Sequence, residues 1–151
     1  MECDDYFMGL ALEEAERGYL RAEVPVGAVL IDADGQILAK AHNMPITWND
    51  PTAHAEILAI RNASARAGNY RLPETVMYVT LEPCAMCVGA MLHSRMKRLV
   101  FGARDPRGGA AGSVVDLTGI ARLNHRIEVT GGVLAVECAE ILRRFFKERR
   151  D

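Results

Sequence analysis

The chain has 151 residues and a mass of 16.6 kDa, which is the usual size of one domain. Its residues are 50% hydrophobic and 25% charged, so the composition excludes a disordered chain, a collagen and a pure coiled coil. No apolar run approaches the roughly 20 residues that cross a bilayer, and residues 2–5 are acidic, unlike the start of a signal peptide. We therefore expect a single domain over residues 1–151 in a soluble, cytoplasmic protein.

The net charge of −2 is unevenly distributed along the chain. Residues 1–60 carry 3 basic and 11 acidic side chains, whereas residues 61–151 carry 15 and 9. A basic second part hints at a nucleic-acid partner, although charge alone favours an ordinary solvated surface.

The four cysteines are poorly arranged for disulfides. Cys84 and Cys87 form one C-x-x-C pair, and Cys3 and Cys138 are scattered. This pattern favours a reducing compartment. We assign no function to Cys3 or Cys138, because free cysteine is commonly a small buried hydrophobe or a bystander near a terminus.

The first part of the chain predicts a helix, a hairpin and a second helix. Apolar residues at helical spacing indicate a helix over residues 5–18. Strands are expected at 24–31 and 37–41, joined by a turn at 32–35. Residues 43–52 are typical of a loop, and Thr52 is the expected N-cap of a helix that covers residues 53–60.

The remaining elements complete an α/β layered domain with a mixed sheet. A β-branched and aromatic strand is expected at 75–81, and Pro83 is well placed to open an almost wholly apolar helix over 85–92. Further strands are expected at 98–102 and 126–130. A terminal helix follows, with Leu134, Cys138, Ile141, Leu142 and Phe145 on one face.

Two motifs carry metal chemistry. His54 and Glu56 form H-x-E, and Cys84 and Cys87 lie in P-C-x-x-C after the next strand. One imidazole and two thiolates provide three zinc ligands and leave the fourth position open for water, as in catalytic zinc sites. The two cysteines lie one turn apart at a helix start, where the helix dipole favours thiolates.

Glu56 is a candidate proton shuttle, because a carboxylate beside activated water can take a proton and return it to a leaving group. Residues two apart do not share a face of a regular helix, so His54 and Glu56 converge only in an irregular first turn. With Thr52 as the N-cap, both residues lie in that turn.

Each of these residues has an ordinary explanation when it is taken alone. His54 could be a structural histidine, Glu56 a partner of the helix dipole, and C-x-x-C a thioredoxin-like redox pair. Taken together they favour a zinc hydrolase, because a redox pair explains neither His54 nor Glu56.

The combined motifs resemble the zinc nucleobase deaminases, and the sequence is similar to the tRNA adenosine deaminases among them over nearly the whole chain. The similarity is densest at residues 23–29, 50–56, 78–84, 93–95, 100–105 and 109–113. It implies one zinc-dependent nucleoside deaminase domain with a three-layer α/β/α cytidine-deaminase-like fold and a central mixed five-stranded sheet. It also implies one Zn²⁺ per subunit on His54, Cys84 and Cys87, with Glu56 as general acid/base.

The same resemblance implies hydrolytic deamination of adenosine to inosine at the wobble position of a tRNA anticodon. Asn43 would bind the extruded nucleoside and Asp105 would contact that nucleotide or its neighbour. Phe146, Arg149 and Arg150 would hold the anticodon stem-loop by stacking and phosphate contacts. Residues 105–108 and 117–123 depart from the family's usual form.

Two other functions remain open. A deaminase of free guanine or cytosine would keep the whole zinc site but would not need the basic C-terminus. A structural-zinc or redox module would not depend on Glu56. The apolar character of residues 85–92 also predicts a homodimer, the alternative being a helix enclosed within one domain.

Overall fold

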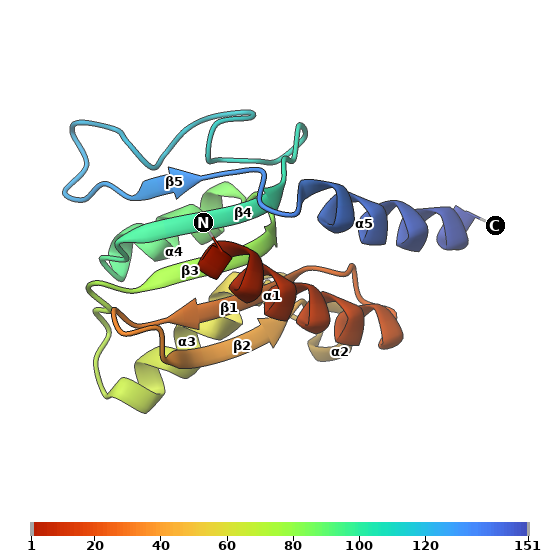
Figure 1. The fold of residues 1–151 in the computed structure, drawn as a ribbon, viewed down its shortest axis with the longest axis horizontal. Coiled ribbons are helices and arrows are strands. Elements are labelled where there is room, and N and C mark those ends of the chain that lie inside the picture. The colour runs from red at the N-terminus through yellow and green to blue at the C-terminus, as the bar shows by residue number, and fades with distance from the viewer. Residues whose placement is uncertain (1, 151) are drawn as a thin grey trace.

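The computed structural model describes residues 2–150 and contains a central sheet with helices on both faces (Figure 1). The helices are α1 (Glu2–Leu20), α2 (Pro45–Trp48), α3 (Ala55–Ala67), α4 (Ala85–His93) and α5 (Ala135–Arg150). The strands are β1 (Gly27–Ile31), β2 (Ile37–His42), β3 (Val76–Leu81), β4 (Arg98–Ala103) and β5 (Glu128–Thr130).

The sheet is mixed and has the strand order β2-β1-β3-β4-β5. Strand β1 is antiparallel to β2 and β3, whereas β3, β4 and β5 are parallel to one another. Because β3 and β4 are parallel, the segments that follow them leave from the same edge of the sheet. The P-C-x-x-C motif and the segment that carries Asp105 therefore start side by side.

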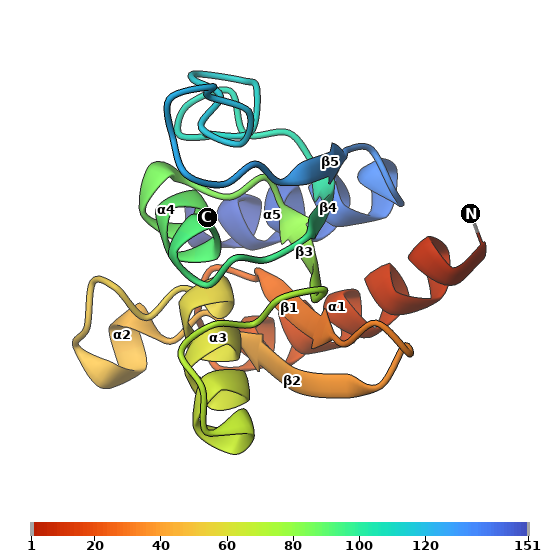
Figure 2. The ribbon, with the colours of Figure 1, turned by 90° about the vertical axis from the view of Figure 1, so that its left-hand side faces the viewer.

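Alternating strand residues supply the two layers of the core, as the period of a strand requires. Val29 and Tyr78 pack with α1 and α5 on one face, while Leu30 and Met77 pack with α3 and α4 on the other. Figure 2 shows α3 and α4 on the side of the strands away from α1. This arrangement confirms the expected three-layer fold with a mixed five-stranded sheet.

The hairpin turn at residues 32–35 also forms as predicted. The side-chain oxygen of Asp32 accepts hydrogen bonds from the backbone N–H groups of Asp34 and Gln36. Gly35 has a φ of 81°, a left-handed conformation that glycine adopts without a steric penalty.

The prediction that Thr52 is the N-cap of the second helix is wrong. Helix α3 starts at Ala55 and its N-cap is His54, while the Thr52 hydroxyl donates to the Asp50 carboxylate. The short helix α2 also lies inside the segment expected to be only a loop, and α3 continues to Ala67, well past the expected end at residue 60.

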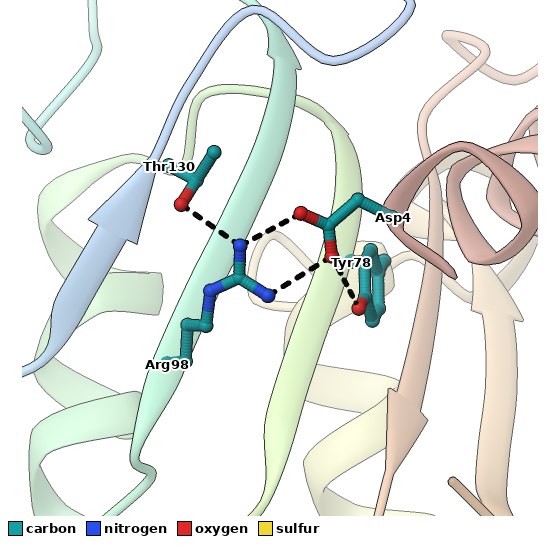
Figure 3. A network of polar contacts seen from close by, with 4 residues as sticks. All are labelled: Asp4, Tyr78, Arg98 and Thr130. Atoms are coloured by element: carbon teal, nitrogen blue, oxygen red, sulfur yellow. Dashed lines mark hydrogen bonds and ion pairs between the residues drawn. The ribbon is translucent and has the colours of Figure 1, made fainter. Parts of the chain in front are cut away.

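An ion pair between the buried Asp4 and the partly buried Arg98 attaches α1 to the sheet, at the edge opposite the H-x-E and P-C-x-x-C motifs. The Asp4 carboxylate accepts hydrogen bonds from the Arg98 guanidinium and from the Tyr78 hydroxyl (Figure 3). The two bonds from Arg98 measure 2.7 and 2.9 Å, and the bond from Tyr78 measures 2.8 Å. Arg98 also donates to the Thr130 hydroxyl at 2.9 Å. The hydrogen bonds with Arg98 hold the pKa of Asp4 below its usual value, against the effect of burial.

The connection between the parallel strands β4 and β5 is a long irregular segment over residues 104–127 (Figure 1). A single bridge pairs Ala111 with Asp116 within it. Long loops of this kind are commonly functional. Among residues 2–150, no helix is both long and apolar enough to span a membrane.

Candidate zinc centre and substrate cavity

The side chains of His54, Cys84 and Cys87 converge at the N-termini of α3 and α4. The Nδ1 atom of His54 lies 3.6 Å from the Sγ atom of each cysteine, and the three ligand atoms all lie within 4.8 Å of one another. Within the described residues, they form the one cluster of potential ligands from His, Cys, Asp and Glu side chains.

Local backbone geometry explains this convergence. His54 is the N-cap of α3 and Cys84 is the N-cap of α4, and both have extended backbone angles. Cys87 follows in the first turn of α4, so both thiols lie near unpaired N–H groups and the positive end of the helix dipole. The predicted position of both cysteines at a helix start is confirmed.

The donor set fits a zinc ion in both type and spacing. Zn–S bonds of about 2.3 Å and Zn–N bonds of about 2.0–2.1 Å at tetrahedral angles place nitrogen and sulfur about 3.5 Å apart. The 3.6 Å separations of His54 from Cys84 and Cys87 match that value. Three protein ligands leave one position for a water molecule.

The protonation state of each of these three side chains affects the pKa of the others. Hydrogen bonds from Cys87 and then His54 lower the pKa of Cys84 to about 4, so Cys84 is the readiest thiolate. The hydrogen bond to Cys84, together with burial, raises the pKa of Cys87 above its ordinary value. The contact with Cys84 likewise raises the pKa of His54, against the effect of burial. Zinc binding must therefore displace protons from the site.

Glu56 is the second residue of α3 and lies against the same cluster. Its side chain is only 4% exposed, and burial raises its pKa to about 7, while its own backbone N–H and the charge of His54 oppose the rise. A carboxyl group that titrates near neutral pH can both accept and donate a proton. The irregular helix start therefore brings His54 and Glu56 together, although the cap is His54 rather than Thr52.

A cavity of about 250 Å³ opens onto this cluster. Asn43 and Asp105 line it together with His54, Glu56 and Cys84. The side-chain oxygen of Asn43 accepts a hydrogen bond from the Ala55 N–H at 2.8 Å, so its NH₂ group remains as the donor for a ligand.

A larger cavity of about 820 Å³ lies beside the first and is lined by basic side chains. Its walls include Asp105 and the α5 residues Phe146, Arg149 and Arg150, so the structure brings together four of the predicted RNA-contacting residues. Phe145 is buried in the core, as expected from its helix face, whereas Phe146 is 47% exposed. The two cavities share Asp105 as a common wall.

Arg149 has an intramolecular role as well. Its guanidinium donates to the Ala22 carbonyl at 3.1 Å and lies 4.5 Å from the centre of the Phe145 ring. The hydrogen bond ties α5 to the turn that follows α1, and the ring contact lies within α5.

Two buried glutamates beside the cavity were not predicted from sequence. Glu23 accepts hydrogen bonds from the N–H groups of Ile46 and Thr47 and so holds the start of α2. Glu82 lines the zinc cavity; burial alone would raise its pKa, but hydrogen bonds led by Ser113 lower it. For Glu82 the available signal was a charged residue directly after an apolar strand and before Pro83.

Comparisons with known proteins agree with this geometry. Residues 1–103 match the family described as the cytidine and deoxycytidylate deaminase zinc-binding region. The chain is also 51% identical over 150 residues to the tRNA-specific adenosine deaminase of Haemophilus influenzae, with 99% of this chain and 87% of the relative covered. The chain belongs to the tRNA-specific adenosine deaminase family.

Solved structures place the family assignment in context. A structure from a study of A-to-I editing by tRNA:A34 deaminases superposes with a TM-score of 0.87 and 47% identity, covering 91% of this chain and 99% of that one. A guanine deaminase from Nitrosomonas europaea gives a TM-score of 0.78 and 26% identity, covering 93% and 83%. The fold is therefore shared with guanine deaminases, while the sequence is closer to the tRNA deaminases.

Proposed function

We propose that this protein converts adenosine to inosine at the wobble position of a tRNA anticodon by zinc-dependent hydrolysis. The observation that carries the proposal is the shared wall at Asp105, which joins a small cavity with a zinc-type ligand set to a larger basic cavity. A base would enter the first cavity while the flanking nucleotides occupy the second. The names of the relatives that match nearly the whole chain support the same substrate.

The chemistry requires a nucleophile and a proton carrier. When bound by His54, Cys84 and Cys87, zinc supplies the Lewis acidity that makes a water proton removable near neutral pH. Glu56 takes that proton as oxygen adds to C6 of adenine, and passes it to the ring nitrogen. Glu56 then takes the remaining proton from the hydroxyl added at C6 and passes it to the amino group. The C6–N bond breaks, ammonia leaves, and the C6 carbonyl of inosine forms.

Asn43 and Asp105 would position the nucleoside. The NH₂ group of Asn43 is free to donate to an acceptor on the nucleoside, because its oxygen is already bonded to Ala55. Asp105 stands where the nucleoside would pass from the basic cavity into the zinc cavity. An unpaired anticodon loop suits such a site, since extruding a base from a duplex costs a few kcal/mol more.

The basic end of α5 would hold the anticodon stem-loop. Figure 1 shows α5 continuing past the ends of the strands. Phe146 offers an exposed ring for base stacking, and Arg149 and Arg150 offer phosphate contacts along the same cavity. The competing explanation is that these arginines only favour the helix dipole and solubility.

We further propose a homodimer located in the cytoplasm. Helix α4 buries Cys87, Val88 and Met91, but Met86 on its other side is 37% exposed. An apolar helix with an uncovered side favours a second copy of the chain as its cover. The cytoplasm suits both thiolate ligands, which must stay reduced, and a tRNA substrate.

The deciding experiment presents the zinc-loaded protein with three substrates under one condition. The proposal predicts inosine from an anticodon stem-loop with adenosine at the wobble position, and no deamination of free guanine or cytosine. Turnover of a free base without turnover of the stem-loop would identify a small-molecule deaminase. No turnover of any substrate in either the wild type or Glu56→Ala would support a structural-zinc module.

A further inference from the structure

Glu82 is a carboxylate enclosed by one segment of the chain. It directly follows β3, and its side chain is 2% exposed. Its oxygens accept hydrogen bonds from the N–H groups of Asp105 (3.1 Å), Ala111 (3.0 Å) and Ser113 (3.0 Å), and from the Ser113 hydroxyl. All four donors belong to residues 105–113, which lie 23 to 31 positions further along the chain.

The segment wraps closely around this carboxylate. A Cβ atom on Gly109 would lie 2.4 Å from the carboxylate carbon of Glu82, so a larger residue could not fit without displacing one of them. One backbone hydrogen bond reinforces the contact, from the Ala110 N–H to the Pro83 carbonyl at 2.8 Å. The Glu82 N–H itself donates to the carbonyl of Ala103, the last residue of β4, also at 2.8 Å. The segment contains no helix or strand, and its internal hydrogen bonds form turns such as that from the Gly109 N–H to the Asp105 carbonyl. The bonds to Glu82 and Pro83 attach these turns to the end of β3.

The clamped segment is the one that reaches both cavities. Asp105 donates its N–H to Glu82, while its carboxylate accepts from the N–H groups of Arg107 and Gly108. Its position at the wall between the zinc cavity and the basic cavity therefore depends on the Glu82 carboxylate. Glu82 itself stands two residues before the ligand Cys84.

We propose that Glu82 is a positioning residue for the RNA substrate. Its carboxylate holds residues 105–113 closed against the end of β3 and so fixes Asp105 at the entrance to the zinc cavity. The effect on RNA binding rests on the function proposed above, whereas the hydrogen bonds by which Glu82 holds residues 105–113 do not. Glu82 lines the zinc cavity, but its side chain is 2% exposed and its oxygens are occupied by the four donors of residues 105–113. It therefore acts through the segment that it holds.

The test replaces Glu82 by glutamine, which has the same shape but only one acceptor oxygen, so some of the four donors lose their partner. Hydrogen exchange should become faster at the Asp105, Ala111 and Ser113 amides. The KM for an anticodon stem-loop should rise about tenfold, the effect of roughly one lost charge-assisted hydrogen bond, with kcat within about threefold. Zinc content should stay at one per chain.

Two further variants calibrate this result. Ser113→Ala removes only the hydroxyl donor and should raise KM by a smaller factor, which keeps the proposal testable if Glu82→Gln does not fold. Asp4→Asn removes another buried carboxylate at the opposite edge of the sheet. It should leave both the exchange of residues 105–113 and the KM unchanged.

If amide hydrogen exchange in residues 105–113 is unchanged in both Glu82→Gln and Ser113→Ala, the proposal that Glu82 holds this segment is wrong. Loss of zinc from Glu82→Gln would also overturn the proposal, because the residue would then act through Cys84. If the wild type does not deaminate the stem-loop, the proposed function fails, while the exchange measurement still decides whether Glu82 holds the segment.

Discussion

Replacing Glu56 by glutamine should stabilise the zinc-free protein in a pH-dependent manner. Burial raises the pKa of Glu56 to about 7 from the ordinary value of 4.5. Between these pH values the folded protein keeps a proton that the unfolded chain releases, so stability falls as pH rises through this window. The effect is absent below about pH 4.5 and complete above about pH 7.

The pKa values set the size of this effect. Each unit of pKa difference corresponds to about 1.4 kcal/mol, so Glu56 lowers the free energy of unfolding by roughly 3 kcal/mol above pH 7. Glutamine has a similar shape and no charge to desolvate. Glu56→Gln should therefore be up to about 3 kcal/mol more stable than the wild type at pH 8 and nearly equal at pH 4.5, at the expense of activity.

The assay is urea unfolding of the chelated protein at a series of pH values from 4.5 to 8. The matched control is Glu13→Gln on the exposed side of α1, for which we expect no comparable gain. The claim that burial raises the pKa of Glu56 would be refuted by either of two results. The first is a difference in the free energy of unfolding between Glu56→Gln and the wild type that does not change with pH, and the second is a variant less stable than the wild type at pH 8.

The remaining predictions concern the metal, the RNA and the assembly. Cys84→Ala should lose both zinc and activity, because two protein ligands remain; full zinc occupancy by elemental analysis would reject the ligand assignment. Replacing Arg149 and Arg150 by alanine should weaken stem-loop binding and reduce its salt dependence by roughly 0.7 counterions per lost phosphate contact, without changing zinc content. If the affinity for the stem-loop and its dependence on salt concentration are both unaltered, these arginines have a purely structural role. Light scattering at micromolar concentration should give the mass of a dimer. A monomer mass would contradict the proposal that a second copy of the chain covers the exposed side of α4.

The convergence of His54, Cys84 and Cys87 was predictable because it depends on short spacings. Cys84 and Cys87 are three residues apart at a helix start, and His54 precedes a helix that meets the same point. The detail that failed was the N-cap, since a threonine before an apolar run is a common cap. Here the Thr52 hydroxyl is used by Asp50, and the helix starts two residues later.

The hydrogen-bond partners of the buried glutamates Glu23 and Glu82 could not be predicted from the sequence. Glu82 depends on donors that lie 23 to 31 residues away, and Glu23 on a four-residue helix just as distant in sequence. Local sequence patterns do not indicate such distant partners. The partners of Glu82, for example, come close only because the sheet brings the end of β3 beside the segment after β4. The basic cavity likewise forms because α5 lies beside residues 105–107, which periodicity does not reveal.

The most direct test of the proposed activity measures inosine at the wobble position of an anticodon stem-loop, using zinc-loaded wild type and Glu56→Ala. The wild type should convert adenosine to inosine at that position alone. Glu56→Ala should keep one zinc per chain but lose about 10²-fold or more in turnover, the scale of a general acid/base contribution. Absence of inosine with the wild type would contradict the proposed activity. Comparable turnover by Glu56→Ala with zinc bound would contradict the role of Glu56 as the proton carrier.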